Sequence, residues 1–196
     1  MNPYICLEGM DGSGKTTVAK YLATKYGAVV IGNPGGTRLT EALREILLHR
    51  TDIDIPALEA ATLFMAGSIS TMRRCRELAD EGRRVILDRG FASTYAYQSA
   101  DGCPLSSLMN LTNAVPSRIQ PEITLFLDAP TEVRVARMAA AGNRGKDRFE
   151  SKGAEYFERV AVGYRRASQL FSTISINANQ TVEQVADDIA CAAGWK

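Results

Sequence analysis

The stretch Gly9-Met10-Asp11-Gly12-Ser13-Gly14-Lys15-Thr16 decides the fold. It matches the pattern G-x-x-x-x-G-K-[ST], and it lies between a short apolar run and a helical pattern, as a phosphate-binding loop requires. Glycines allow the backbone to turn its N–H groups toward a phosphate, and a helix N-terminus favours an anion. In such a loop Lys15 supplies a positive charge for the terminal phosphates, and the Thr16 hydroxyl is offered to Mg²⁺. The stretch therefore predicts a site for a nucleoside triphosphate.

Short apolar runs alternate with helical patterns on both sides of this loop, which is typical of a parallel sheet covered by helices. The predicted strands are 4–7, 28–31, 84–88, 123–128 and 173–177. The predicted helices are 15–26, 37–48, 56–81, 91–100, 131–140, 154–171 and 182–193. The runs 85–87 and 125–127 have no polar alternation, so we expect them in the interior of the sheet. The fold class predicted is α/β: a P-loop NTPase three-layer sandwich with a five-stranded parallel sheet.

Length and charge limit the remaining possibilities. The 196 residues predict one domain over 1–196, and 23 basic against 22 acidic residues give no excess charge for nucleic acid or an anionic membrane. The chain shows neither the pattern of a signal peptide nor an apolar run long enough to span a bilayer, so we expect a cytoplasmic protein. Four scattered cysteines and the single histidine, His49, predict free thiols and no zinc site.

The residues after the third predicted strand narrow the class of P-loop protein. Asp88-Arg89-Gly90-Phe91 stands where a GTPase has D-x-x-G, and no N-K-x-D run occurs. Small-molecule phosphotransfer is the remaining interpretation. Asp88 is expected at the metal, and Arg89 is expected to hold an acceptor phosphate at the same sheet edge as the loop.

At this point the chain resembles the thymidylate kinase family along nearly its whole length. The matching blocks are Glu8-Gly9-x-Asp11-Gly12-Ser13-Gly14-Lys15-Thr16-Thr17, Pro34-Gly35-Gly36-Thr37, 43–48, Glu59, Leu63-Phe64-x-Ala66, Asp88-Arg89-x-x-x-Ser93-Thr94-x-Ala96-Tyr97-Gln98, 121–128 and 147–150. The resemblance implies transfer of the γ-phosphoryl group of ATP, with Mg²⁺, to a deoxynucleoside 5′-monophosphate. It also implies small nucleotide substrates as the partners, and a homodimer.

The resemblance implies roles for individual residues. The donor would be bound by Gly9, Met10, Asp11, Gly12, Ser13, Gly14, Lys15, Thr16, Thr17 and Arg137, and the metal by Thr16 and Asp88. The acceptor would be bound by Asp11, Arg44, Phe64, Ser68, Arg89, Thr94, Tyr97 and Gln98. Arg137 would stack on the adenine and Phe64 on the acceptor base, while Tyr97 would crowd the 2′ position of the sugar. Arg44 and Arg89 would hold the acceptor phosphate.

A short basic segment, about 141–149, reads as a flap or LID. A closed flap excludes water from the reaction and brings arginines to the transferring phosphate. The implied catalytic residues are Lys15, Asp11, Arg89 and, from the flap, Arg144 and Arg148.

The pattern departs from the family on the acceptor side. Gly32-Asn33 stands where these kinases usually have Arg-Glu, Ser68 lies in the stretch where they place an arginine that donates to O4 of thymine, and Gly90 replaces an aromatic residue or histidine, which would enlarge the same region. Because a serine hydroxyl can donate or accept, Ser68 does not reject a 4-amino group. The sequence thus leaves dTMP or a related pyrimidine open, a 5-substituted dCMP or dUMP as an alternative, and a noncatalytic nucleotide-binding regulator as another. A deoxynucleoside kinase is disfavoured because the two arginines would hold no phosphate.

Overall fold

The computed structural model describes residues 4–140, 149 and 152–195. In this part of the chain five parallel strands form one sheet in the order β2-β3-β1-β4-β5. The strands are β1 (Tyr4–Glu8), β2 (Val29–Gly32), β3 (Val85–Asp88), β4 (Ile123–Asp128) and β5 (Ile174–Asn177). The two runs without polar alternation are therefore interior strands beside the central β1, as predicted.

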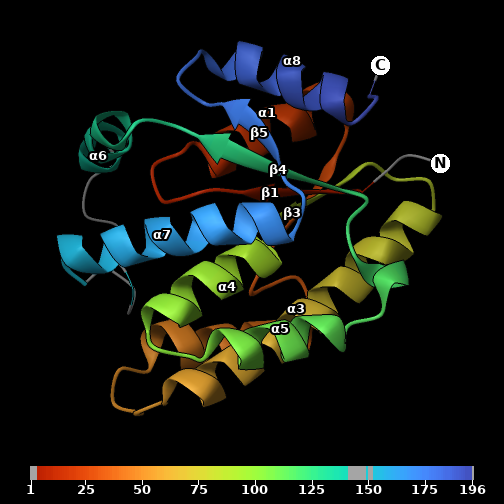
Figure 1. Cartoon of the computed structure of the whole chain (residues 1–196). Helices are drawn as coiled ribbons and strands as arrows, with labels where there is room; N and C mark the ends of the chain where they lie inside the picture. The colour runs from red at the N-terminus through yellow and green to blue at the C-terminus, as the bar shows by residue number, and fades with distance from the viewer. Residues whose placement is uncertain (1–3, 141–148, 150–151, 196) are drawn as a thin grey trace.

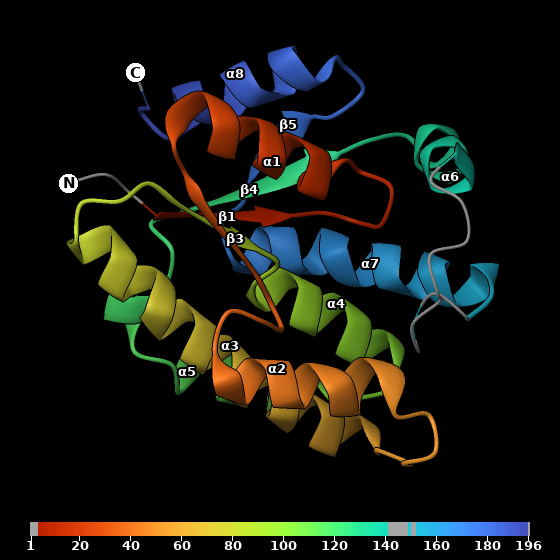
Figure 2. The same cartoon turned by 180° about the vertical axis from the view of Figure 1, so that it is seen from behind.

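Helices cover both faces of the sheet (Figures 1 and 2). The α-helices are α1 (Lys15–Tyr26), α2 (Arg38–Arg44), α3 (Ala57–Asp80), α4 (Phe91–Ala100), α5 (Leu105–Asn113), α6 (Thr131–Ala140), α7 (Ala154–Leu170) and α8 (Val182–Ala192). A π-helical segment, Glu45–His49, continues α2, and a 3₁₀ turn spans Ser117–Ile119. Helices α1 and α8 lie on one face, and α3, α4, α5 and α7 lie on the other, which confirms the three-layer α/β fold.

The alternation of side chains along β1 explains the two layers of core. Ile5 and Leu7 pack with α1 and α8, whereas Tyr4 and Cys6 point the other way and pack with α3 and the start of α4. All four are essentially inaccessible to solvent. A strand buried on both faces needs an apolar residue at every position, and β1 breaks this rule only at Glu8.

Helix α5 is the main element that the sequence interpretation missed. Pro104 precedes it, and Leu105, Leu108 and Leu111 recur at helical spacing, with Leu108 buried. The stretch is short and rich in serine and asparagine, which hid this signal. The helices that the sequence did predict are present within two residues of their predicted ends, except that the end of 37–48 is π-helical.

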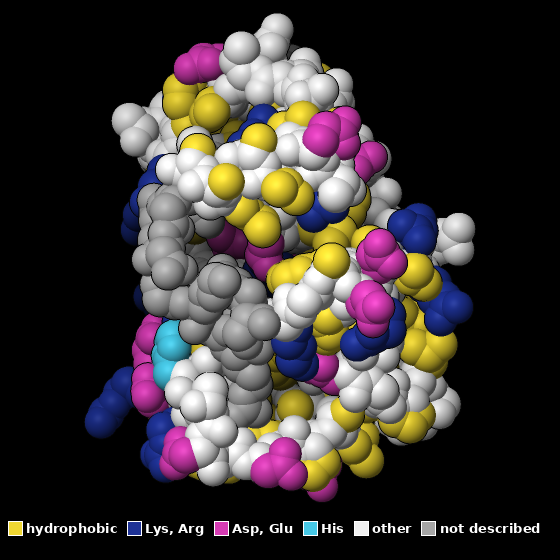
Figure 3. All heavy atoms as spheres, turned by 90° about the vertical axis from the view of Figure 1, so that its left-hand side faces the viewer, with side chains coloured by type: hydrophobic (Ala, Val, Ile, Leu, Met, Phe, Trp, Pro, Cys, Tyr) yellow, Lys and Arg dark blue, Asp and Glu magenta, His cyan; other side chains and the backbone are white. Residues whose placement is uncertain are grey.

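Helix α6 differs from the others because none of its residues is buried. Hydrophobic side chains gather over the upper part of the face on its side of the molecule (Figure 3), and the exposed Val135 and Met138 belong to α6. Polar contacts hold this helix instead: Arg137 donates to the carbonyl oxygens of Ser13 (3.3 Å) and Ala178 (3.0 Å). Among the described residues no helix is long and apolar enough to cross a membrane.

Candidate active site

The loop between β1 and α1 takes a backbone path that its glycines make possible. Gly12 has φ +79°, and a Cβ placed on it would lie 2.4 Å from the carbonyl oxygen of Arg134. Gly9 has φ +143°, and a Cβ there would lie 2.8 Å from the carbonyl oxygen of Leu127. Both the backbone angle and the close approach of other backbone atoms therefore require glycine at these positions.

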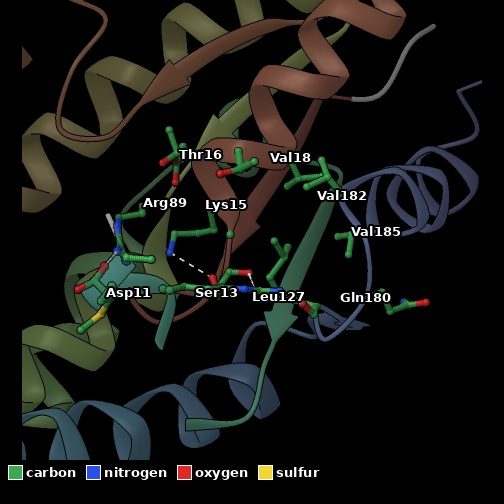
Figure 4. Close-up of a pocket in the computed structure, with 18 of the residues that line it drawn as sticks. Asp11, Ser13, Lys15, Thr16, Val18, Arg89, Leu127, Gln180, Val182 and Val185 are labelled. Carbon is green, nitrogen blue, oxygen red and sulfur yellow. Dashed lines mark hydrogen bonds and ion pairs between the residues drawn. The ribbon is translucent and has the colours of Figure 1, made fainter. Parts of the chain in front are cut away.

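Lys15 is the first residue of α1, and its ammonium group lies under the loop. Nζ donates to the carbonyl oxygens of Gly9 (2.8 Å) and Met10 (3.1 Å), and Figure 4 shows the side chain pointing back toward Ser13. Burial, together with the nearby charge of Arg89, lowers the pKa of Lys15 to about 8. The ammonium is thus held where the loop closes, with a proton that is easier to lose than that of an exposed lysine.

A cavity of about 800 Å³ opens beside this loop (Figure 4). Its volume lies in the range of pockets that hold small ligands. Its wall is formed by Asp11, Gly12, Ser13, Gly14, Lys15, Thr16, Thr17, Asp88, Arg89, Arg137 and residues near the start of α8. Arg137 was predicted to stack on an adenine; its guanidinium donates to the Ser13 and Ala178 carbonyl oxygens at the edge of this cavity, which is called the donor cavity because the residues predicted to bind the donor line it.

Thr16, in the first turn of α1, comes close to Asp88, the last residue of β3. The Thr16 hydroxyl lies 3.5 Å from Asp88 Oδ2, and Asp88 Oδ1 is buried with no hydrogen-bond partner among the described residues. A hydroxyl and a carboxylate with an unused oxygen are oxygen ligands of the kind that Mg²⁺ takes. The described residues contain no cluster of three or more His, Cys, Asp or Glu that could hold a metal without further ligands.

Arg89 lies at the centre of the site, directly after β3. Its φ of +78° is unusual for a residue with a side chain. A hydrogen bond from its backbone N–H to the Leu7 carbonyl oxygen (3.0 Å) holds the backbone in this conformation. Its guanidinium donates to the Gly9 carbonyl oxygen (3.3 Å), Ser93 Oγ (3.2 Å), the Tyr164 hydroxyl (2.9 Å) and the Asp11 carboxylate. The backbone is thus bent to bring a cation to the loop.

Asp11 is the anion that faces Arg89. Burial raises the pKa of Asp11, but Arg89, Lys15 and the Tyr97 hydroxyl, which donates at 2.8 Å, lower it further than burial raises it. The pKa of Asp11 therefore lies below its ordinary value, and the carboxylate is ionised at neutral pH. Asp11 and Arg89 form an ion pair that is partly shielded from water.

Glu8 is a functional residue that the sequence interpretation left without a role. It is fully buried at the end of β1, and its Oε1 accepts from the backbone N–H groups of Gly90 (2.7 Å) and Ser93 (3.0 Å). Ser93 Oγ also donates to this carboxylate. A carboxylate at a helix N-terminus is favourable, so Glu8, at the end of β1, caps the N-terminus of α4. A charged residue ending a fully apolar strand was the available signal.

Replacing Glu8 tests this cap. Glu8→Ala leaves two buried N–H groups without an acceptor, at about 1–3 kcal/mol each. We expect the free energy of unfolding to fall by about 3 kcal/mol, measured by urea denaturation. Glu8→Gln keeps one acceptor oxygen and serves as the matched variant, with an expected loss of about 1 kcal/mol. Equal stability of Glu8→Ala and the unaltered protein would contradict the capping role.

A second cavity, of about 140 Å³, is also lined by Asp11 and Arg89; it is called the acceptor cavity because most of the residues predicted to bind the acceptor line it. It is lined by Asp11, Asn33, Pro34, Arg44, Leu48, Phe64, Arg89, Gly90, Ser93, Thr94, Tyr97, Gln98 and Phe149. Two side-chain amide oxygens here, Asn33 Oδ1 and Gln98 Oε1, are buried and have no partner among the described residues. Unpartnered buried polar atoms at a cavity indicate a place where a polar ligand binds.

Aromatic rings form one end of this acceptor cavity. The ring of Phe149 lies 6.0 Å from that of Phe64 and 5.3 Å from that of Tyr97, between their centroids, and the second pair is edge-to-face. Phe149 belongs to a family block but was assigned no role from the sequence. The ring of Phe149 touches both of the other rings, so the three form one aromatic wall on which a planar ligand can pack.

Three predicted residues differ in how they relate to the acceptor cavity. Arg44 is exposed at its rim and donates to the Pro34 carbonyl oxygen (3.0 Å). Ser68 is fully buried and does not line the cavity; its hydroxyl accepts from the side chain of Asn33. Gly90 lines the cavity, and a Cβ on it would lie 2.9 Å from Cys6 Sγ.

The remaining predictions are distributed as follows. Thr94, Tyr97 and Gln98 follow one another along α4 and line the acceptor cavity, as expected of residues that face one ligand. Arg144 and Arg148, and all of the proposed flap except Phe149, lie outside the described residues. His49 is on the surface, where it is the cyan side chain of Figure 3, and the four cysteines are free.

A glycine-bent loop between a central strand and a helix, beside two cavities that both border Asp11 and Arg89, defines a P-loop nucleotide-binding protein. The family model for thymidylate kinase matches residues 7–189. The chain belongs to the thymidylate kinase family, which confirms the resemblance inferred from its motifs.

Individual relatives agree with the family model. The thymidylate kinase of Ectopseudomonas mendocina (strain ymp) is 36% identical, over 95% of this chain and 92% of that protein. Those of Chromobacterium violaceum and Cupriavidus taiwanensis are 34% and 35% identical, over 95% of this chain and 91% and 95% of those proteins. The similarity therefore covers both cavities.

Proposed function

We propose that this protein transfers the γ-phosphoryl group of ATP to dTMP, giving ADP and dTDP. The family supports this activity, because curated thymidylate kinases align with almost the entire chain. Nothing in the comparisons favours a modified-pyrimidine kinase or a noncatalytic regulator. The enzyme is accordingly a nucleoside monophosphate kinase.

The observation that carries the proposal is the wall shared by the two cavities. Asp11 and Arg89 line the donor cavity and the acceptor cavity alike. A γ-phosphoryl group bound at the loop and a monophosphate bound on the other side would meet at these two residues. In-line transfer requires only that the attacking and leaving oxygens be positioned and their charge stabilised. The arrangement suits a reaction between two nucleotides.

On the donor side, the loop backbone and Lys15 bind the phosphates of ATP. The Lys15 ammonium lies under the loop, bonded to the Gly9 carbonyl oxygen, and stabilises the charge that develops during transfer. Thr16 and Asp88 would hold Mg²⁺, since the unpartnered Asp88 Oδ1 and the Thr16 hydroxyl fit its preference for oxygen ligands. When bound, Mg²⁺ neutralises charge on the phosphate oxygens.

On the acceptor side, Arg89 and Arg44 bind the phosphate of dTMP. The ionised Asp11 keeps the Arg89 guanidinium turned toward the shared wall. Phe64 and Phe149, which pack against each other, form the apolar wall for the base, and Thr94 and Gln98 meet its polar edge from α4. We also propose that Arg144 and Arg148 approach the transferring group.

A coupled ADP-release assay with ATP, Mg²⁺ and a panel of deoxynucleoside monophosphates tests the proposal. We expect dTMP to stimulate ADP release, and mass spectrometry to find dTDP. A regulator would bind ATP without consuming it in the presence of any monophosphate. Absence of turnover with every monophosphate would therefore refute the proposed function. The predicted homodimer is tested separately by light scattering after size-exclusion chromatography.

The pKa of Lys15 predicts how activity depends on pH. Its ordinary value is 10.5, and burial lowers it to about 8. The charged form binds phosphate, so kcat/KM for ATP should fall as pH rises through about 8, by up to tenfold per pH unit. Initial rates from pH 6.5 to 9.5 measure this, with circular dichroism at each pH to show that the protein stays folded. A kcat/KM that is constant to pH 9.5 would show that Lys15 does not bind ATP as an ammonium ion.

A further inference from the structure

The side chain of Asn33 lies at the edge of the acceptor cavity with one end fixed and the other end unused. Asn33 follows β2, and its backbone N–H donates to the Asp88 carbonyl oxygen (2.9 Å). Its Nδ2 donates to Ser68 Oγ at 2.8 Å. Its Oδ1 is buried and has no partner among the described residues. A buried carbonyl without a hydrogen bond costs about 1–3 kcal/mol, so this oxygen is suited to a ligand donor.

Ser68 explains why the amide points this way. It is fully buried on α3, four residues after Phe64, so the two side chains lie on the same face of the helix. Phe64 lines the cavity, whereas Ser68 reaches it only through Asn33. A base that lies flat against Phe64 would therefore direct one of its edges toward the amide that Ser68 holds.

We infer that Asn33 is a specificity-determining residue for the acceptor base and that Ser68 is its positioning residue. The inference rests on the proposed function, because it requires a nucleotide in the acceptor cavity. The residue that recognises the base is then Asn33, and not Ser68 as the sequence alone suggested. Asn33 contacts the hydrogen-bonding edge of the base, and Ser68 acts through Asn33.

The chemistry of the pair sets what it accepts. An amide has an acceptor oxygen at one end and two N–H donors at the other, and a serine hydroxyl can pair with either end. In the observed orientation Asn33 Oδ1 accepts from a base N–H. With the amide turned over, the Ser68 hydroxyl donates to Oδ1 and Nδ2 donates to a base carbonyl. The observed orientation therefore suits a 4-amino group, whereas a 4-oxo group requires the turned-over amide, in which Nδ2 is the donor to the base.

Asn33→Asp tests this reading, because the two side chains have nearly the same shape and a carboxylate only accepts. It can pair with the 4-amino group of dCMP, but it repels the 4-oxo group of dTMP. We expect the ratio of kcat/KM for dTMP to that for dCMP to fall by about tenfold or more. A ratio within twofold of that of the unaltered enzyme would overturn the inference.

Two further variants keep the test decisive if the buried carboxylate prevents folding. Asn33→Leu has a similar shape without polar atoms, and Ser68→Ala removes only the hydroxyl. Both should raise KM for dTMP about tenfold while KM for ATP stays within twofold, because donor binding does not use this pair. An unchanged KM for dTMP in Asn33→Leu would overturn the role of Asn33, and one in Ser68→Ala the role of Ser68.

Thr112→Val is the matched control for loss of a buried hydroxyl. Thr112 lies on α5 and donates to its own helix, at Leu108 (2.9 Å), away from both cavities. We expect its KM values to be unchanged. An equal effect in Thr112→Val and Ser68→Ala would show that the Ser68 effect comes from general loosening of the core, and would refute the positioning role of Ser68.

If the unaltered enzyme phosphorylates no monophosphate, the proposed function fails. If it phosphorylates dTMP and Asn33→Asp leaves the ratio unchanged, only this inference fails.

Discussion

Lys15→Met is expected to reduce kcat by about a thousandfold, the size of effect seen when one preorganised charge-stabilising donor is removed. Methionine preserves the length of the side chain but removes the charge that lies under the loop. The loss should appear in kcat more than in KM for dTMP, because Lys15 lines only the donor cavity. Steady-state ADP release, with ATP and dTMP varied in turn, measures both constants.

Lys20→Met is the control for this substitution. Lys20 lies on the same helix, five residues further on, and its side chain is exposed. We expect its kcat to match that of the unaltered enzyme. Retention of more than a tenth of the activity by Lys15→Met would show that the loop backbone alone stabilises the transferring phosphate.

Arg89→Met is expected to lower kcat/KM for dTMP by about a thousandfold and to destabilise the protein. It removes the positive charge at the wall shared by the two cavities, where an arginine side chain is expected to stabilise the transferring phosphoryl group. It also leaves Asp11 as a buried carboxylate without its cation, at a cost of about 3 kcal/mol. Kinetics with dTMP and urea denaturation measure the two effects separately.

The double variant Arg89→Met with Asp11→Asn separates charge from packing. Removing both charges should restore most of the lost stability while activity stays low. Arg74→Met, which alters an exposed arginine paired with Glu77, should change neither property. If Arg89→Met binds dTMP with an unchanged KM and retains its kcat, Arg89 has only a structural role.

Most of the fold could be predicted because its signals are local. The apolar runs of β1, β3 and β4 and the loop at Gly12 carry their own evidence in consecutive residues. Helix α5 was missed because only two of its residues, Leu108 and Thr112, are buried, and Leu108 packs on residues that lie elsewhere in the chain. The π-helical end of the 37–48 segment likewise depends on how Leu47 and Leu48 pack.

The candidate site was predictable to a different extent on its two sides. All predicted donor residues except Arg137 lie in one continuous stretch, 9–17, so their spacing alone predicted a common site. The acceptor residues come from the loop after β2, from α2, α3 and α4, and from the segment at Phe149, and their contacts depend on tertiary packing. The motif therefore pointed to Ser68, but it could not show that Ser68 is buried and bonded to Asn33. The bonds of Glu8 to the start of α4 join positions more than 80 residues apart, and no local pattern reveals them.

Glu8 also fixes the geometry of the reaction. It immediately precedes Gly9, the first residue of the phosphate loop, and its carboxylate holds Gly90 and Ser93, next to the arginine that faces the acceptor. One side chain thus links the phosphate loop to the start of α4 and holds these two segments at a fixed separation. The distance between the two bound phosphates is then set by the protein before either nucleotide binds.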